Sequence, residues 1–565
     1  MTKKQRWYVS VSATLTLFLL APVVATAGGD SEAAAETEVL EITWLMKPQY
    51  GSETTWFIQE LEKVFPVKIT PNLVHPHEGE KITIMLGAGE FPDAGYIFDR
   101  PINLYQEGVT RGIPKDMIRE HMPNFSKMVD SEYPIGWSLD NNPDNKDEVL
   151  CIQGVQAFTD TGLFYLNFRS DWAKNVGIEL PDYEKKKISL DRFGRVYFYD
   201  EVLTLDWFER LLVAFRDGDP DGNGKIDTIP LGAFNSISWS WGPLMGAFGV
   251  SPLSYHNLEV DGELYHWQIA PGFKDFLKQI ADWYGQGLVD KEFANLDRTK
   301  AYEKVEKGLV GAVAANMNYP GIFYAMNRPP NSIVRDEELG TGAESVMIPP
   351  VSGPTGLHGT HSYEAFSGMG TRNGFMVNRN VSDEKLVMIL KILDYMLWGD
   401  DETWIYGQFG QPGVHLDWEG EPFNSTPIPR KENEIPEGNI KDGYFGTYYP
   451  DASTKSRIRF THPKHMAEFY NNYLLAAPGL VHTIRTYRYD IMGETKAAEI
   501  WKENGATLNT LQQEFMYDAI YGNIDIDSKW DTYVAQWRRN GGDSWLAEME
   551  KTPIVAEARK GNIVY

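Results

Sequence analysis

The sharpest chemical pattern in the chain is the nine-residue loop DPDGNGKID, which runs from Asp219 to Asp227. Side chains that carry oxygen occupy its first, third, fifth and ninth positions. The sixth position is glycine, and the seventh can contribute its backbone carbonyl as a ligand. The candidate ligands are Asp219, Asp221, Asn223, Lys225 (through its carbonyl) and Asp227. This spacing is typical of the opening of an EF-hand-type calcium loop, because Ca²⁺ prefers oxygen ligands and the glycine permits the sharp turn. We therefore predict a bound calcium ion with a structural role.

The twelfth position of the loop is Pro230, where a bidentate glutamate normally closes the calcium shell. The closing carboxylate must then come from elsewhere in the fold, or the site is weak or empty. The alternative interpretation is a turn rich in Asp, Asn and Gly that joins a helix to a strand. The sequence shows no second loop of this kind, so a signalling role is not indicated.

Catalytic signatures are absent from the sequence. It contains no H-E-x-x-H, G-x-S-x-G, G-x-x-x-x-G-K-[ST] or G-x-G-x-x-G pattern. This favours a protein that is not an enzyme. A carboxylate pair for glycoside hydrolysis stays open as an alternative, because Asp and Glu total 79 and their separation in space is invisible in a sequence. An exported carbohydrate-active enzyme, a lyase or a hydrolase, is therefore the second hypothesis.

Composition narrows the class of protein further. The 565 residues are enough for more than one domain, and a single cysteine, Cys151, permits no internal disulfide. The formal net charge of −26 repels phosphate backbones, so we expect no nucleic-acid partner. The 17 Trp and 29 Tyr offer flat apolar faces on which sugar rings can stack, although core packing explains most aromatic residues in any protein.

The N-terminus has the order of a secretory signal peptide. Basic residues precede an apolar stretch from Trp7 to Ala25, and an A-x-A cleavage site ends at Ala27. We predict that residues 1–27 are a signal peptide and that residues 28–38, which are small and acidic, form a disordered leader. Removal of the signal would make the net charge three units more negative.

The rest of the chain alternates strand-like runs with amphipathic helices, which predicts an α/β architecture. Residues 39–45 read as a strong first strand and residues 54–65 as the helix that follows it. Three longer stripes of apolar residues at helical spacing begin near Thr204, Phe273 and Ser382, and we interpret them as core packing.

Several segments, taken in order, resemble the bacterial extracellular solute-binding proteins of family 1. The segment KITIMLGAGEFPDAGY (residues 81–96) is similar to that family's helix followed by G-[DE]-x-P-D, and YLNFRSDWAKNVGIELP (residues 165–181) to its strand and helix. Residues 204–231 resemble the helix and calcium-type loop of the large lipoprotein branch. Residues 307–317, 347–359 and 527–542 follow in the order that this branch shows. The resemblance covers nearly the whole chain after the predicted signal.

The resemblance implies a two-lobe periplasmic binding protein fold of the class II type, with crossing hinge strands and an interlobe cleft. By this analogy residues 39–167 and 370–410 form lobe 1. Residues 168–369 and 411–565 form lobe 2, which contains the calcium-type loop at 219–230. The implied function is that of the substrate-binding subunit of an ABC importer, which captures a carbohydrate, most simply an oligosaccharide, and delivers it to the permease. A sensor's binding subunit shares the fold, and the sequence does not separate the two roles.

Ligand contacts are expected at strand ends, where open α/β sheets bind their ligands. The residues chosen on this ground are Trp44, Asp99, Trp239, Trp241, Asn318, Tyr319, Arg372 and Asn373. The ligand's chemical identity is left open by the sequence. Partners expected from the resemblance are a carbohydrate and the transmembrane subunits of an ABC permease, with the chain itself a monomer.

The cysteine that carries the lipid in many relatives is missing after the apolar stretch, since Cys151 is far from it. A lipid tether is therefore not predicted. We expect an exported protein that is free in a periplasm.

Overall fold

A computed structural model describes most of the chain after the leader. The described residues are 39–75, 78–97, 99–156, 164–189, 195–253, 255–316, 342–361, 369–418, 420–445, 452–453, 457, 483–490 and 495–559. The predicted signal peptide (1–27) and acidic leader (28–38) lie outside them. Among the described residues, no helix combines the length and the apolar composition needed to span a membrane.

The first sheet has six strands in the order β2-β1-β3-β17-β7-β20. Their bounds are β1 Leu40–Leu45, β2 Val67–Asn72, β3 Ala94–Gly95, β7 Ile152–Gln156, β17 Met369–Val377 and β20 Ala452–Ser453. β1 is parallel to both β2 and β3, whereas β17 runs antiparallel to β3 and β7. The fourth strand of this sheet therefore comes from a segment more than 200 residues after its neighbour β7.

Helices cover the first sheet as the apolar stripes predict. Helix α1 (Trp56–Val64) begins where Thr55 accepts a hydrogen bond from the backbone N–H of Ile58 at 3.2 Å, which caps the predicted helix 54–65. Helix α14 (Asp383–Leu393) is capped by Ser382 and buries Leu386, Ile389 and Leu390. The helices α4 (Lys115–His121), α5 (Pro123–Glu132) and α15 (Asp401–Phe409) complete the same core.

The second sheet also has six strands, in the order β11-β14-β8-β15-β10-β9. Their bounds are β8 Phe164–Arg169, β9 Lys187–Ser189, β10 Val196–Tyr199, β11 Ile229–Gly232, β14 Val310–Asn316 and β15 Ser345–Ile348. β11 is parallel to β14, and β8 runs antiparallel to both β14 and β15. In sequence, all six strands of the second sheet thus lie between strands β7 and β17 of the first sheet.

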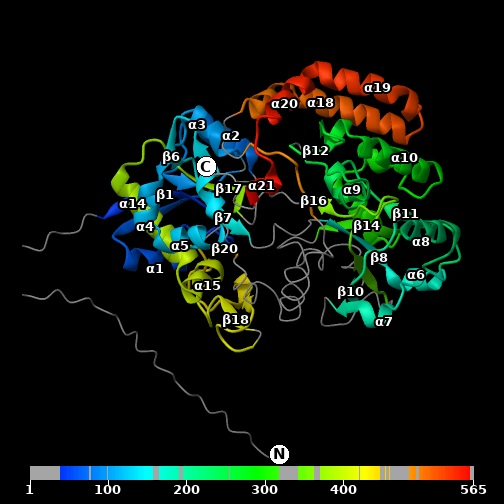
Figure 1. The fold of residues 1–565 in the computed structure, drawn as a ribbon. Helices are drawn as coiled ribbons and strands as arrows, with labels where there is room; N and C mark the ends of the chain where they lie inside the picture. Colours follow the sequence, from blue (N-terminus) through cyan, green and yellow to red (C-terminus); the bar gives the residue numbers. More distant parts are fainter. Residues whose placement is uncertain are drawn as a thin grey trace, which may run out of the picture. The chain divides into compact units, whose positions relative to one another are not determined.

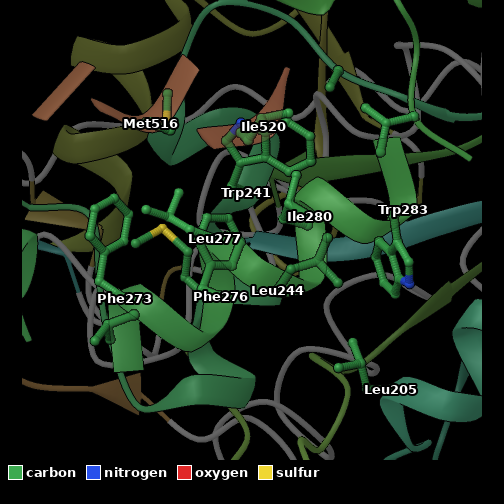
Figure 2. Close-up of a cluster of buried hydrophobic side chains, with 14 of the residues drawn as sticks. Leu205, Trp241, Leu244, Phe273, Phe276, Leu277, Ile280, Trp283, Met516 and Ile520 are labelled. Carbon is green, nitrogen blue, oxygen red and sulfur yellow. The ribbon is translucent and has the colours of Figure 1, made fainter. Parts of the chain in front are cut away.

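The core of the second sheet is rich in aromatic side chains (Figure 2). Its main helices are α8 (Leu205–Asp217), α9 (Ile237–Met245), α10 (Pro271–Gly285) and α18 (Ala497–Ile520). Thr204 caps α8 by accepting from Trp207 N–H at 3.1 Å, as the sequence suggests. Helix α10 packs against α18, which lies beside α19 (Ile526–Trp537) and α20 (Asp543–Met549) in Figure 1. Residues 497–549 therefore belong to the second core.

The division of the chain between the two cores differs from the predicted lobes after residue 410. Leu416, Phe445 and Ala452 pack in the first core, although the prediction places residues 411–565 in lobe 2. The last described helix, α21 (Val555–Arg559), also contributes Val555 and Ala558 to the first core. The physical reason is that β20 pairs with β7, which keeps the chain on the first sheet beyond the point that the analogy suggests.

Candidate functional site

The carboxyl end of β1 carries Trp44, which the sequence predicts as a ligand contact, and leads into the loop at residues 46–55. Trp44 is fully buried, and its ring centroid lies 5.0 Å from those of Phe375 and Phe445. A ring with no exposed surface has no face to offer to a ligand. Here the structure differs from the prediction, because it gives Trp44 a packing role in the first core.

The same loop is held by a residue that the sequence analysis does not single out. The fully buried carboxylate of Asp442 accepts hydrogen bonds from the backbone N–H of Tyr50 at 2.8 Å and of Ser52 at 3.0 Å. Burial, with the charge of Asp442 beside it, raises the pKa of the Tyr50 phenol, which therefore stays protonated. Asp442 is 392 residues away from Tyr50 in sequence, so no local pattern could have revealed it.

Asp99 lies on an exposed turn before α3 (Pro101–Gln106), close to the end of β3. Its carboxylate accepts from the backbone N–H of Arg100 at 2.7 Å and from the side-chain amide of Asn103 at 2.7 Å. The contacts orient the carboxylate at the start of the helix. The exposed position is compatible with the predicted role of accepting hydrogen bonds from sugar hydroxyls.

A second acidic side chain, Asp140, contacts residues at the start of β7. Its carboxylate accepts from the amide of Gln153 at 2.8 Å and from the thiol of Cys151 at 3.4 Å. Burial raises the pKa of Asp140 to about 6, against the lowering effect of these bonds and of the Arg100 charge. The same burial raises the pKa of the Cys151 thiol well above its usual value, so the thiol stays protonated and packs as a small buried side chain.

Arg372 and Asn373, which the sequence predicts as ligand contacts, belong to β17, and their side chains lie outside the described part of the structure. The pairing of β17 with β7 shifts register between Gly370 and Phe375. At Gly374 a Cβ atom would lie 2.5 Å from the sulfur of Cys151, so no larger residue fits there without a shift. The backbone at this position is thus packed directly on the thiol that donates to Asp140.

In the second sheet, the two predicted tryptophans of α9 have different surroundings. Trp241 is only 1% exposed and packs edge-on against Phe276 and Phe293 in the core (Figure 2). Trp239 is partly exposed, and its ring contacts Phe164 edge-to-face at 5.0 Å. A helix turns successive side chains about 100° apart, so residues two positions apart point to nearly opposite sides. The structure therefore gives Trp241 a packing role, whereas Trp239 keeps an exposed surface.

Trp239 lies at the carboxyl edge of the parallel pair β11 and β14. Its contact Phe164 is the first residue of β8 and pairs with Asn316, the last residue of β14. The chain continues from Asn316 to the predicted Asn318 and Tyr319, which lie outside the described residues. Ligands of open α/β sheets bind at this edge, which is the ground on which Trp239 is predicted as a ligand contact.

The calcium-type loop is exposed and folded around its own carboxylates. Asp219 accepts from the backbone N–H of Asn223 at 3.0 Å and of Gly224 at 2.8 Å. The side-chain amide of Asn223 donates to Asp221 at 2.7 Å and to Asp227 at 3.3 Å, so its positive end lies between two carboxylates. Gly224 has φ +83°, a conformation that glycine adopts without strain and that the predicted sharp turn needs.

The loop has some, but not all, of the ligands that a calcium ion needs. Burial, together with the charges of Asp219 and Asp227, raises the pKa of Asp221, which indicates that negative charge is concentrated there. Pro230 at the twelfth position supplies no side-chain ligand. Within the described ranges, no three His, Cys, Asp or Glu side chains converge as a formed metal site.

The first sheet's side of the molecule also carries a polar depression of about 740 Å³, next to the end of α3. Its lining includes Tyr105, Arg111, Asp144, Glu148 and Arg379. Most of these groups are already paired, for example Arg111 with Asp383 at 2.8 Å and the Tyr105 hydroxyl with Asp144 at 2.9 Å. None of the residues predicted from the sequence lines this depression.

No protein-family model matches the chain. The chain is 24% identical over 527 residues to lipoprotein LipO of Bacillus subtilis, with 90% of each protein covered. It is also 24% identical over 535 residues to the fructooligosaccharide ABC transporter substrate-binding protein FusA of Streptococcus pneumoniae, covering 89% of this chain and 87% of FusA.

The solved structures give the same picture of the fold. The complex of S. pneumoniae FusA with kestose has a TM-score of 0.66 at 19% identity, covering 93% of this chain and all of that one. A FusA EF-hand mutant in complex with fructo-nystose has a TM-score of 0.65 at 18% identity, with the same coverage. Over about nine-tenths of its length the chain is thus similar in sequence to an ABC transporter substrate-binding protein and to a lipoprotein, and it has the α/β fold of the solved substrate-binding protein FusA.

Proposed function

We propose that this protein is the substrate-binding subunit of an ABC importer, which captures an oligosaccharide and delivers it to the permease. The observation that carries the proposal is the similarity to FusA, a fructooligosaccharide-binding subunit, along nearly the full length of both chains. The topology supports it, since the second sheet is inserted between β7 and β17 of the first. Such an arrangement joins two α/β bodies by strands and suits hinged closure on a ligand.

The proposed action is capture without turnover. The homologues are binding proteins, and the residues of this chain that reach the strand edges include stacking and hydrogen-bonding groups. Trp239 would offer an aromatic face to a sugar ring, and Asp99 would accept hydrogen bonds from sugar hydroxyls. Asn318, Tyr319, Arg372 and Asn373 belong to the same proposed site.

We include a structural calcium ion in this proposal. Asp219, Asp221, Asn223, Asp227 and the carbonyl of Lys225 would hold it, and the ion would neutralise the carboxylates that the loop brings together. The existence of an EF-hand in FusA, which the solved EF-hand mutant makes plain, supports the assignment. The ion's contribution would be to fix the connection between α8 and β11.

The proposed location is outside the cytoplasmic membrane. The order of charge, apolar stretch and A-x-A site in residues 1–27 supports export. Placement in a periplasm, as a monomer, is the finer part of the proposal. The partners would be the carbohydrate and the transmembrane subunits of the permease.

A glycan screen by thermal shift tests this function. Purified chain without residues 1–27 is mixed with neutral and acidic oligosaccharides of two to six units. A ligand that binds only the folded state raises the melting temperature, because its binding adds RT ln(1 + [L]/Kd) to the free energy of unfolding. We expect at least one glycan class to raise it in a saturable way. A flat response across the whole screen would remove the carbohydrate assignment.

A further inference from the structure

The loop that follows the carboxyl end of β1 (residues 46–55) is held by the distant residue Asp442. The two oxygens of its carboxylate each accept one backbone N–H, from Tyr50 at 2.8 Å and from Ser52 at 3.0 Å. Gly51, between these two donors, has φ +76°, a conformation that glycine adopts without strain. Asp442 therefore binds the backbone of a tight turn rather than a side chain.

The backbone at Asp442 closes the far end of the same loop. Its carbonyl accepts from the N–H of Trp56 at 2.9 Å, and the carbonyl of Gly443 accepts from the N–H of Phe57 at 3.2 Å. Trp56 and Phe57 begin α1, where the N–H groups have no partner within the helix. Two successive residues thus bind both the turn of the loop and the helix into which the loop leads.

His415 keeps this segment in place. Its Nδ1 accepts from the N–H of Gln411 at 3.0 Å, so the proton is on Nε2, which donates to the carbonyl of Ile440 at 2.9 Å. A Cβ atom at Gly443 would lie 2.3 Å from the ring, so no larger residue fits there without a shift. The carboxylate of Asp442 is therefore presented to the loop by a closely packed support.

The carboxylate of Asp442 depends on the loop as much as the loop depends on it. It is fully buried and, among the described residues, forms no ion pair. A buried carboxylate is costly unless hydrogen bonds replace those it made with water, and the two N–H groups of the loop supply such bonds. Since this side chain has no exposed surface, it can act on a ligand only through the loop.

Loop 46–55 lies at the edge of the first sheet where a ligand is expected. β1 runs parallel to β2 and β3, and open α/β sheets bind ligands beyond the carboxyl ends of such strands. Gln49 and Glu53 of the loop are exposed, whereas Tyr50 and Ser52 are half-buried. The turn held by the buried carboxylate determines where these groups point. A loop that is ordered before the ligand arrives loses less conformational entropy on binding, which strengthens the binding.

We propose that Asp442 is a positioning residue for glycan binding, which holds loop 46–55 ready for the ligand and does not touch the ligand itself. This inference rests on the proposed function and deepens it, because it names a residue that sets the affinity from behind the site. Without Asp442 the loop would have to be ordered during binding, and the apparent affinity would fall by the fraction of chains whose loop is not ordered.

Asp442→Asn tests the carboxylate with almost no change in shape. An amide has one oxygen, so it can accept one N–H of the loop and places its own N–H groups against the other. Hydrogen exchange measured by mass spectrometry, without any glycan, reports on the loop directly. We expect the amides of residues 46–55 to exchange about tenfold faster in this variant than in the native chain.

Isothermal titration then measures the affinity, at a temperature at which every variant is folded. The titrant is kestose, the sugar in the FusA complex, or, if the native chain does not bind it, the glycan with the largest thermal shift in the screen. We expect Asp442→Asn to raise Kd by about tenfold, the size of one lost charge-assisted hydrogen bond.

Asp93→Asn is the matched control. The carboxylate of Asp93 also binds β1 over a long sequence distance, through the N–H and the hydroxyl of Thr43, but it acts on the strand and not on the loop. We expect this variant to be less stable than the native chain, to keep the native exchange in residues 46–55 and to keep Kd within about twofold. General destabilisation is thereby separated from positioning of the loop.

Gly51→Ala tests the same turn from its exposed side and keeps the inference testable if Asp442→Asn does not fold. No atom lies within 4 Å of the added Cβ, but alanine is strained at φ +76°. We expect faster exchange in the loop and a Kd raised by about fivefold.

Three results would overturn the inference. Unchanged exchange in Asp442→Asn, or faster exchange with an unchanged Kd in the loop variants, would do so and leave the proposed function in place. An equal rise of Kd in Asp93→Asn would do so as well, because stability rather than the loop would then set the affinity. If the native chain bound no glycan of the screen, the proposed function would fall and this inference with it.

Discussion

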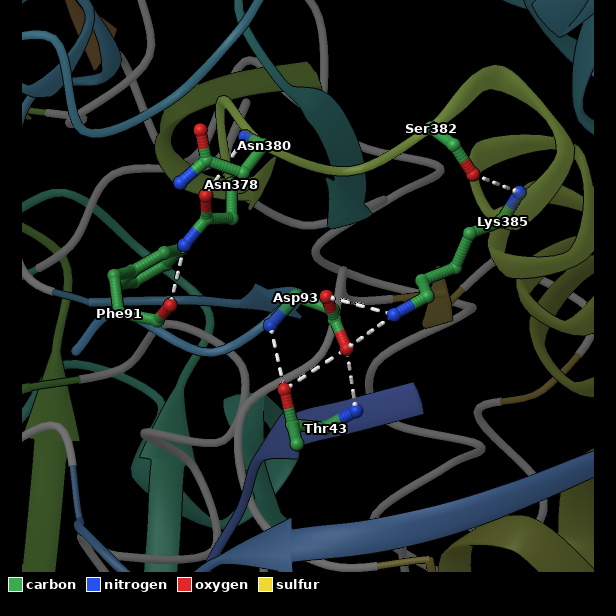
Figure 3. Close-up of polar contacts among 7 residues, drawn as sticks. All are labelled: Thr43, Phe91, Asp93, Asn378, Asn380, Ser382 and Lys385. Atoms are coloured by element: carbon green, nitrogen blue, oxygen red, sulfur yellow. Dashed lines mark hydrogen bonds and ion pairs between the residues drawn. The ribbon is translucent and has the colours of Figure 1, made fainter. Parts of the chain in front are cut away.

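Asp93 and Thr43 bind each other through three hydrogen bonds. The carboxylate of Asp93 accepts from the backbone N–H of Thr43 at 2.8 Å and from its hydroxyl at 2.9 Å, and the hydroxyl in turn accepts from the backbone N–H of Asp93 at 2.8 Å (Figure 3). Lys385 of α14 adds an ion pair to the same carboxylate at 3.2 Å. One side chain thus ties β1, the turn before β3 and a covering helix together. Asp93 is the aspartate of the G-E-F-P-D segment on which the family resemblance rests, so its role is architectural.

Replacing Asp93 should therefore lower stability. Asp93→Ala removes the acceptor of two bonds to Thr43 and leaves Lys385 without its partner, and we expect a loss of about 2–3 kcal/mol in the free energy of unfolding. Urea denaturation followed by fluorescence measures it. Asp531→Ala is the control, since Asp531 is exposed and makes no hydrogen bond or ion pair in the described part of the chain. Equal midpoints for the two variants would contradict this role.

Asp140 should make stability depend on pH between about 4 and 6. Its pKa in the folded chain is about 6, above the usual value of 3.8, so the folded state binds the proton more tightly than the unfolded state does. The contribution of this group to stability is therefore fully present below pH 4 and is lost as the pH rises through 6. The loss is at most about 3 kcal/mol.

Asp140→Asn isolates that effect, because an amide cannot ionise. The difference in free energy of unfolding between the native chain and Asp140→Asn should shift against the native chain as the pH rises from 4 to 6.5. Denaturant titrations at half-unit pH intervals measure the difference. A difference that stays constant over this range would show that burial does not raise the pKa of Asp140.

Chelation should lower the melting temperature if the loop at 219–227 holds calcium. An ion that binds only the folded state at a hundred times its Kd adds about 2.7 kcal/mol to the free energy of unfolding. Scanning calorimetry with excess Ca²⁺ and with a chelator measures the shift. The double variant Asp219→Ala, Asp221→Ala should melt at the same temperature in both buffers, whereas Asp531→Ala should respond as the native chain does. Identical native melts in the two buffers would mean that the loop is a turn without a metal.

The sequence predicts local elements well in this chain and long-range contacts poorly. Apolar spacing and capping residues locate the starts of α1, α8 and α14 to within about two residues, because a helix depends on neighbours three and four positions away. The bond from Tyr50 to Asp442 joins two segments that are 392 residues apart in the chain, and no local pattern encodes it. The same limit explains the lobe boundary near residue 410, since the pairing of β20 with β7 depends on a distant strand.

Two aromatic residues of the candidate ligand site show most clearly what the sequence alone does not predict. Trp239 and Trp241 are two positions apart in one helix. The sequence does not indicate which of the two is the better candidate to stack on a sugar. The structure places Trp241 in the core and leaves Trp239 partly exposed beside Arg298. Which side of α9 faces the core depends on Phe276 and Phe293, residues that other segments supply.

The proposed capture of a glycan without turnover is tested most directly by isothermal titration of the purified chain, with the glycan recovered afterwards and analysed by mass. We expect saturable binding of one glycan per chain with a Kd of about 1 μM or tighter, which corresponds to about −8 kcal/mol, and recovery of the glycan at its original mass. Absence of saturable heat with every glycan class, or recovery of a shortened or unsaturated product, would contradict the account.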